Sequence, residues 1–247
     1  MLGRKSEDDM NANGRQNYSH GQENHKPLRL SESAQQQRCL YPVEHSAQKL
    51  SHLEQDLRAS IRLQVSQQHY QQAISLITQL IDSNPHNAQD YNNRGLMRFK
   101  IGQYEQALED YNQALRLNPR LDSAYNNRAN YHAAQGDIAA AIADYDAALD
   151  FNPANLRASI NQAIAFRQLG LYDLALDNLD LALVLGRRLK GRIYLERGRT
   201  YHLRGDWNCA VADYNRALEQ LSDTSNNHHY RQQVQRWLDE LLQPISA

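Results

Sequence analysis

The chain has 247 residues, of which 41% are hydrophobic and 22% are charged, and its formal net charge at pH 7 is −1. A chain that is almost neutral has no general electrostatic attraction to nucleic acid or to anionic membranes. Its two cysteines, Cys39 and Cys209, are too few for a disulfide framework or a metal site, so we expect a reducing, cytoplasmic location.

Residues 1–45 are predicted to be a disordered polar arm. They consist mainly of Asn, Gln, Ser, His and charged residues, and such a composition cannot bury enough apolar surface to offset chain entropy. No apolar stretch follows the positive charges near Met1, so we expect no secretory signal, and no later stretch is long enough to span a bilayer.

From residue 46 to residue 224 the sequence predicts an array of repeats. Pro85, Pro119 and Pro153 follow one another at intervals of 34 residues, and a fixed period of this length is typical of a stacked helical solenoid. We place the repeats at 54–87, 88–121, 122–155, 156–190 and 191–224.

Each repeat is predicted to be a hairpin of two helices. Apolar residues recur at helical spacing over two stretches of each repeat, and a glycine turn such as Gly102 or Gly136 divides them. Small residues are needed where the two helices cross closely, because larger ones would wedge the helices apart. These small residues are Gly95, Ala129, Ala163 and Gly198 on the first helices, and Ala107, Ala141, Ala175 and Ala210 on the second helices.

Two further features of the repeat have structural interpretations. An Asn-Pro pair should end the second helix and set the entry into the next repeat, at residues 84–85, 118–119 and 152–153. Large side chains after the crossing should fill the space against the next hairpin, and these are Tyr111, Tyr145, Leu179 and Tyr214.

The pattern changes at two places in the array. Repeat one has Ile61 where a small residue is expected, and its apolar series begins early, so we expect an atypical end repeat whose first helix starts near Ser46. Between repeats four and five, residues 186–192 replace the Asn-Pro stop and add one residue, which predicts a looser or re-angled joint.

Residues 225–247 are predicted to be a C-terminal capping helix and tail. Between His228 and Gln243 the apolar residues fall on one side of a helix. They are Tyr230, Val234, Trp237, Leu238, Leu241 and Leu242.

The repeat as a whole reads Tyr91-Asn-Asn-Arg-Gly95, then Gly102-x-Tyr104-x-x-Ala107, then Asn118-Pro119. It resembles the tetratricopeptide repeat, whose pattern runs aromatic-x-x-Leu-Gly, Ala-x-x-x-Phe and Pro. The resemblance implies an all-α fold, a right-handed solenoid of five helical hairpins with a C-terminal capping helix. It also implies a non-enzymatic scaffold or adaptor for protein partners. Bacterial members assist the assembly of photosynthetic complexes, pili or secretion systems, and the sequence does not choose among these.

Charge appears in pairs at two places of the repeat. Where the seventh place is Arg94, Arg128 or Arg197, the twenty-third is Asp110, Asp144 or Asp213. Repeat four has the neutral pair Gln162 and Asn178 instead. These places lie at similar height on facing helices, so we predict three Arg–Asp bridges and one amide pair. Common descent of the repeats would produce the same pattern.

The predicted ligand surface is the concave side, which the resemblance assigns to the first helix of each hairpin. The sixth place reads Asn93, Asn127 and Asn161, and an amide can pair with both the N–H and the C=O of an extended peptide. This row is similar to the asparagine ladder in the repeat domain of the glycosyltransferase that attaches N-acetylglucosamine to serine and threonine. A helix-packing role for these asparagines is the alternative. The candidate peptide-binding residues are Asn92, Asn93, Asn126, Asn127, Asn130, Arg157 and Asn161.

Two other binding modes are weighed against this one. Arg58, Arg62 and Asn93 match the first part of the carboxylate clamp with which related repeats hold chaperone tails, but Ser123 and Asn127 stand where further basic residues belong. The other mode is an electrostatic site for an acidic partner or nucleic acid in residues 187–204. Its candidate residues are Arg187, Arg188, Lys190, Arg192 and Arg199.

Catalysis, metals and cofactors are not expected. His228 and His229 are adjacent rather than spaced to aim at one metal ion from a helix, and no glycine-rich phosphate loop is present. Asp144 and Asp146 are interpreted as part of a solvated helix face. Aromatic residues such as Tyr194 and Tyr201 are already used for packing, so we do not expect nucleic acid as the partner. The terminal helices would allow homo-oligomerisation.

Overall fold

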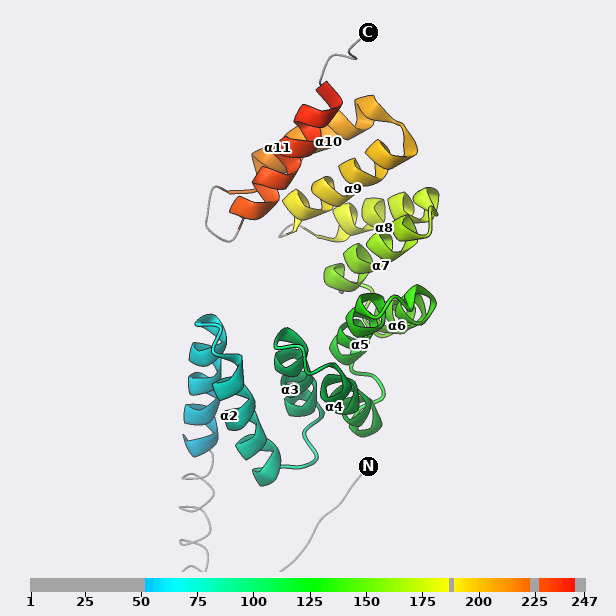
Figure 1. Cartoon of the computed structure of the whole chain (residues 1–247). Coiled ribbons are helices and arrows are strands. Elements are labelled where there is room, and N and C mark those ends of the chain that lie inside the picture. Colours follow the sequence, from blue (N-terminus) through cyan, green and yellow to red (C-terminus); the bar gives the residue numbers. More distant parts are fainter. Residues whose placement is uncertain (1–51, 187–188, 223–226, 243–247) are drawn as a thin grey trace, which may run out of the picture. The chain divides into compact units, whose positions relative to one another are not determined.

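The computed structural model describes residues 52–186, 189–222 and 227–242 (Figure 1). Every regular element within these ranges is an α-helix. The predicted arm 1–45, the predicted helix start near Ser46 and the chain end from 243 lie outside the described residues, and they stay predictions. The all-α fold class is confirmed.

The helices follow one another as antiparallel hairpins. Helical residues 52–66 pack against α2, and α3 with α4, α5 with α6, α7 with α8 and α9 with α10 form the next four pairs (Figure 1). The first helices of successive hairpins also touch, α3 with α5, α5 with α7 and α7 with α9. The bounds are α2 Tyr70–Ser83, α3 Ala88–Lys100, α4 Tyr104–Leu117, α5 Asp122–Ala134, α6 Ile138–Phe151, α7 Leu156–Gln168, α8 Tyr172–Leu185, α9 Lys190–Arg204, α10 Trp207–Gln220 and α11 His228–Leu242.

The hairpin turns depend on a left-handed residue. Gly102, Gly136, Gly170 and Gly205 have φ angles of 79°, 81°, 74° and 94°. The first hairpin uses Gln68 at the equivalent place, with φ 61°. A residue with a Cβ is strained in this region, whereas glycine is not. The first hairpin therefore differs from the others in its turn chemistry.

The predicted small residues lie where the helices cross. A Cβ on Gly95 would be 2.7 Å from Cε1 of Tyr111 and 3.1 Å from the backbone oxygen of Ala107. Ala107 and Tyr111 are both completely buried. This confirms that small residues allow the close approach and that the large residue four places on fills the space beside it.

The helix ends also agree with the sequence. Asn84, Asn118 and Asn152 follow the last residues of α2, α4 and α6, and each donates its backbone N–H to a carbonyl of the last turn. Proline comes next in each case and cannot continue a helix. At the end of α8, Gly186 takes this place. The joint that follows includes residues 187–188, which lie outside the described residues, so its predicted looseness stays a prediction.

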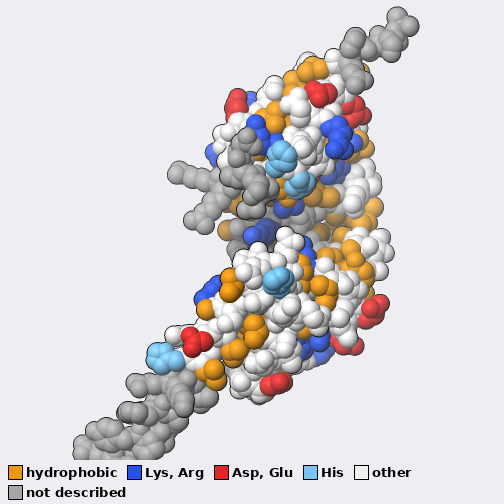
Figure 2. Space-filling model, turned by 60° about the vertical axis from the view of Figure 1, so that its left-hand side comes forward, with side chains coloured by type: hydrophobic (Ala, Val, Ile, Leu, Met, Phe, Trp, Pro, Cys, Tyr) orange, Lys and Arg blue, Asp and Glu red, His pale blue; other side chains and the backbone are white. Residues whose placement is uncertain are grey.

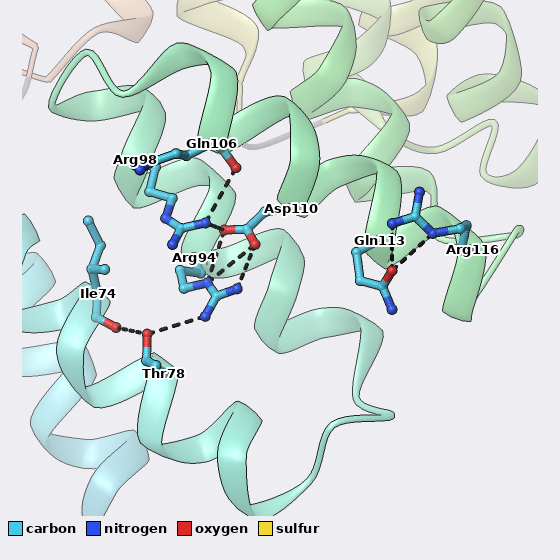
Figure 3. A network of polar contacts seen from close by, with 8 residues as sticks. All are labelled: Ile74, Thr78, Arg94, Arg98, Gln106, Asp110, Gln113 and Arg116. Carbon is cyan, nitrogen blue, oxygen red and sulfur yellow. Dashed lines mark hydrogen bonds and ion pairs between the residues drawn. The ribbon is translucent and has the colours of Figure 1, made fainter.

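All three predicted Arg–Asp bridges are confirmed. Arg94 Nη2 lies 2.8 Å from Asp110 Oδ1 (Figure 3), Arg128 Nη2 lies 2.8 Å from Asp144 Oδ1, and Arg197 Nε lies 2.6 Å from Asp213 Oδ2. In repeat four, Asn178 Nδ2 donates to Gln162 Oε1 at 2.6 Å. The three aspartates are buried. The interpretation of Asp144 as a solvated residue is therefore wrong, because its position opposite Arg128 places it between the helices.

The seventh-place residue makes a second bond that the sequence analysis missed. Arg94 Nη1 donates to Thr78 Oγ1 at 3.3 Å, and Arg128 Nη1 donates to Asn112 Oδ1 at 2.8 Å (Figure 3 shows the former). Gln162 likewise donates to Asp146, and Arg197 donates to Asp180. In each case the acceptor is on the second helix of the preceding repeat. One side chain thus connects two hairpins.

The helix α11 lies against the last hairpin. Val234 and Leu238 are buried in a cluster with Leu195, Tyr214 and Leu221. The Trp237 ring stacks on Tyr214 at 5.9 Å, whereas Leu242, which was predicted to share the buried side, is 63% exposed because it is the last residue of the helix. The helix covers apolar residues of α9 and α10.

Candidate binding groove on the first helices

A hollow of about 350 Å³ opens across the first helices of repeats two to five. It draws side chains from α3, α4, α5, α7 and α9. In the space-filling view, blue Lys and Arg side chains appear in the hollowed middle of the visible face (Figure 2). The lining residues are Leu96, Phe99, Lys100, Tyr111, Asn126, Asn127, Asn130, Arg157, Asn161 and Arg192. We call this hollow the groove.

The helical period aims these side chains at one place. Asn126 and Asn130 are four residues apart on α5, and Arg157 and Asn161 are four apart on α7, so each pair projects from one face of its helix. Because equivalent first helices touch, the faces of α5 and α7 adjoin. The groove is therefore a product of the repeat stacking.

The groove amides are hydrogen-bonded to one another across repeats. Asn127 Nδ2 donates to Asn92 Oδ1 at 2.9 Å, and Asn161 Nδ2 donates to Asn130 Oδ1 at 2.9 Å. Asn126 Nδ2 donates to Asn127 Oδ1 at 3.3 Å. This series of hydrogen bonds ends at Arg192, because Arg192 Nη2 donates to Asn161 Oδ1 at 3.3 Å.

This network gives two of the three predicted ladder residues, Asn127 and Asn161, a structural role. Asn92 and Asn126 are buried, and Asn93 is bonded to Gln89 on its own helix and is not a lining residue. Asn127 and Asn161 are thus structural as well as exposed to the groove, because each donates to an asparagine of the preceding repeat. The helix-packing role that the sequence analysis gave as the alternative therefore applies to Asn127 and Asn161, which bond to the preceding repeat, and peptide binding by these amides stays a prediction.

The Asn127 side chain has hydrogen-bonding groups that the network does not use. A side-chain amide offers two donors and two lone pairs. Asn127 uses one donor on Asn92 and one lone pair for Asn126. Within the described part of the chain, one donor and one acceptor of this amide form no hydrogen bond.

Positive charge surrounds the amides. Lys100, Arg157 and Arg192 line the groove, and no Asp or Glu is among the lining residues. None of the three cations forms an ion pair with a carboxylate within the described part of the chain. Among the described residues, the lining of the groove therefore carries positive charge without a paired carboxylate.

Two buried polar atoms beside the groove have no hydrogen-bond partner among the described residues. They are the hydroxyl of Tyr111 and the Nε of Arg192. Burial raises the pKa of the Tyr111 phenol above its ordinary value, and the charge of Asp110 raises it further, so the hydroxyl stays a donor at neutral pH. Buried polar groups normally have partners.

The predicted site residues distribute as follows. Five of the seven candidate peptide-binding residues line the groove, and the exceptions are Asn92 and Asn93. Arg192, assigned in the sequence analysis to the separate basic site, also lines it. The sequence analysis missed four groove residues, which are Tyr111, Leu96, Phe99 and Lys100. Tyr111 could have been found by comparing the twenty-fourth place of the repeats together with the ninth place, which is the apolar Leu96 in repeat two.

The predicted basic site is largely dispersed. Arg187 and Arg188 lie outside the described residues, and Lys190 begins α9. Arg199 lies over the ring of Trp237 at 4.7 Å. Arg204, from the same segment, is paired with Asp173 and Asp206.

The carboxylate-clamp interpretation is also corrected. Arg58 binds Asp90 through two bonds, Nη1 to Oδ1 at 2.8 Å and Nη2 to Oδ2 at 3.0 Å. Its Nη2 also pairs with Glu54. These carboxylates occupy the guanidinium, so Arg58 holds repeats one and two together rather than a ligand tail.

The described residues contain no group of three or more His, Cys, Asp or Glu side chains that could hold a metal ion. Among the described helices, none is long and apolar enough to cross a membrane.

Comparisons with known proteins now identify the repeat. A family profile described as "TPR repeat" matches residues 95–136, and one described as "Tetratricopeptide repeat" matches residues 126–188. The chain therefore contains tetratricopeptide repeats, which the profiles place within residues 95–188. Such repeats support a role as a protein–protein interaction scaffold. None of the curated proteins matches the chain.

Solved structures show the same helical repeat solenoid. The crystal structure of a thermophilic TPR protein in Thermus thermophilus is 21% identical, with a TM-score of 0.63, covering 73% of this chain and 99% of that one. The crystal structure of MamA is 20% identical, with a TM-score of 0.54, covering 64% of this chain and 91% of that one. The APC/C hetero-tetramer Cut9-Hcn1 matches at 17% identity and a TM-score of 0.65, over 73% of this chain and 34% of that one. At these identities the likeness shows the fold alone.

Proposed function

We propose that this protein is a non-enzymatic scaffold that holds an extended segment of a partner protein in the groove. The observation that carries the proposal is the hollow of about 350 Å³ that four successive repeats line with amides and cations. Its size suits a few side chains of a peptide rather than a folded domain. The donor and acceptor of Asn127 that no described residue occupies are suited to a peptide unit in the extended conformation.

The proposal keeps the cytoplasmic location that the cysteine usage predicts, and it requires no cofactor. An acidic partner, which the sequence analysis assigned to a separate basic site, becomes part of the same proposal, because Arg192 lines the groove. Nucleic acid is not proposed. Arg197 and Arg204 are paired with carboxylates, and Arg199 lies over Trp237, so this part of α9 presents few uncommitted charges to phosphate.

The test is selection of short peptides from a random library on the immobilised full chain, followed by mapping of their binding site. The photocrosslinking amino acid benzoylphenylalanine replaces Phe99, a residue that lines the groove. The side chain of benzoylphenylalanine is similar in shape to that of phenylalanine. The matched control carries it at Phe151, a 41% exposed phenylalanine that is not a lining residue.

We expect enriched peptides to crosslink at position 99 and not at position 151. The proposal is overturned if no peptide is enriched over a blank surface. It is equally overturned if crosslinking at position 151 matches or exceeds that at position 99.

A further inference from the structure

Where the twenty-fourth place of the repeat is a tyrosine, its hydroxyl has a polar partner on the first helix in repeats three and five but not in repeat two. In repeat three, the Tyr145 hydroxyl donates to Asn130 Oδ1 at 2.7 Å, and Asn130 occupies the ninth place. In repeat five, the Tyr214 hydroxyl lies 3.2 Å from His202 Nδ1. Repeat four has Leu179, which needs no partner. The first helix therefore supplies a polar partner to the hydroxyl in these two repeats.

Repeat two lacks such a partner. Its ninth place is Leu96, which offers no hydrogen bond, yet its twenty-fourth place is Tyr111. The residue is completely buried, and its hydroxyl has no partner among the described residues. Both Leu96 and Tyr111 line the groove. A group that enters the groove can therefore supply the acceptor that the fold withholds from Tyr111.

Other donors around the groove also lack a hydrogen-bond acceptor or an ion-pair partner among the described residues. The Nε of Arg192 is buried and has no hydrogen-bond partner in the described part of the chain, and Arg157 and Lys100 are cations without a described ion pair. Tyr111 and Arg192 are on α4 and α9, so repeats two and five present these donors to one hollow. A ligand suited to this lining must bring acceptors and negative charge.

A carboxylate fits these requirements better than an amide. An ionised Asp or Glu side chain is an acceptor only, with about four lone-pair sites, whereas Gln or Asn would direct an NH₂ group at donors. Hydrogen bonds from a phenol or guanidinium to a carboxylate are stronger than those to a neutral acceptor. We propose that the segment held in the groove carries an Asp or Glu side chain, which binds among Tyr111, Arg157 and Arg192. This inference rests on the proposed function and names the chemistry of its ligand.

The experiment uses the full chain and the peptides that crosslink at position 99. We expect them to share an acidic residue at one position, and we expect its Glu→Gln or Asp→Asn change to weaken binding by about tenfold or more in fluorescence anisotropy. Raised salt should weaken the acidic peptide more than its neutral counterpart.

Variants of the protein assign the effect to named residues. Tyr111→Phe and Arg192→Gln should each weaken the acidic peptide by about tenfold and leave the neutral counterpart almost unchanged. Arg116→Gln removes an exposed arginine whose guanidinium is bonded to Gln113, away from the groove, and should change neither. Leu96→Asn reproduces the partner of repeat three, so it should occupy the Tyr111 hydroxyl and weaken the acidic peptide.

Tyr111→Phe removes no hydrogen bond that the described residues form, so its melting temperature should stay the same or rise. A fall of several degrees would show that the hydroxyl is structural and would overturn the inference. Peptides that crosslink at position 99 without a shared acidic residue would overturn it while the proposed function stands. If no peptide crosslinks at position 99, both the proposed function and this inference are overturned.

Discussion

The arginine at the seventh place of the repeat pairs with a buried aspartate at the twenty-third place, and this pair is important for stability. The Asp144 side chain is 11% exposed and the Arg128 side chain 24% exposed, so neither charge is fully hydrated. The hydrogen bond to Asp144 raises the pKa of Arg128 above its ordinary value, against the effect of burial. Removing either residue would leave a charge with little water around it.

We therefore expect a double-mutant cycle on Arg128→Met and Asp144→Asn to give a coupling of about 1–3 kcal/mol in the free energy of unfolding. The control cycle uses Arg204 and Asp173, whose side chains are 35% and 87% exposed. That exposed pair should couple by about 0.2–1 kcal/mol. Equal couplings in urea unfolding would mean that burial gives the first pair no special role.

The turn of the first hairpin gives a second prediction at this scale. Gln68 has φ 61°, a conformation that costs a residue with a Cβ about 1–2 kcal/mol. Gln68→Gly should therefore raise the free energy of unfolding by about 0.5–1 kcal/mol, since part of the gain is offset by the flexibility of glycine in the unfolded chain.

Gly136→Ala is the matched control for this turn. Nothing lies within 4 Å of a Cβ at Gly136, so any loss of stability must come from its φ of 81° rather than from a clash. Chemical denaturation should show the two changes with opposite signs. A destabilising Gln68→Gly would contradict the assignment of strain to that turn.

Among the helices, α11 has the clearest separate role. It buries Val234 against the last hairpin, and its Tyr230 lies 5.9 Å from the guanidinium of Arg192. Arg231 Nη1 also donates to the backbone oxygens of Leu218 and Leu221 at the end of α10. The helix therefore covers apolar surface and lies beside one end of the groove.

Val234→Asp should detach α11, because a carboxylate cannot enter that cluster without a partner. We expect a loss of about 2–4 kcal/mol, with increased self-association as the apolar surface is exposed. Light scattering and thermal melting measure both effects. Gln232→Asp makes the same charge change at an exposed position of the helix, and it should cause neither the loss of stability nor the self-association. A monomeric Val234→Asp with unchanged melting would mean that α11 covers nothing and is available to a partner.

For the whole array, the contacts run between neighbouring helices and neighbouring first helices. Each hairpin is thus stabilised by the hairpins beside it, and stability adds up approximately along the chain. The seventh-place residues add a polar connection between successive hairpins, as Arg128 does between α4 and α6.

Ala141→Leu should show how local this stability is. Ala141 is completely buried where α5 crosses α6, so the added atoms should overpack the crossing at a cost of about 1–3 kcal/mol. Hydrogen exchange should quicken most in α5 and α6, less in α4 and α7, and least in α10. Uniform loss of protection over the described helices would show that the array unfolds as one cooperative unit instead.

The sequence alone determined the features that repeat within one hairpin. The 34-residue period, the small residues opposite Ala107, the turn glycines and the Arg–Asp bridges are visible because each recurs at fixed places. Local chemistry is enough to interpret them: a helix crossing needs small side chains, and a left-handed turn favours glycine. The pairing of Arg128 with Asp144 followed from comparing the repeats in sequence, and it needed no knowledge of how successive hairpins stack.

Tertiary structure alone decided which repeats share a site. The bonds from Asn127 to Asn92 and from Arg192 to Asn161 join residues 35 and 31 positions apart, and their geometry depends on how successive hairpins stack. The same stacking brings Arg192 from the predicted basic segment into the groove, and it buries the Tyr111 hydroxyl beside Leu96 without an acceptor. A one-dimensional pattern records what each repeat contains, whereas hydrogen bonds between repeats depend on distances and angles that only packing sets.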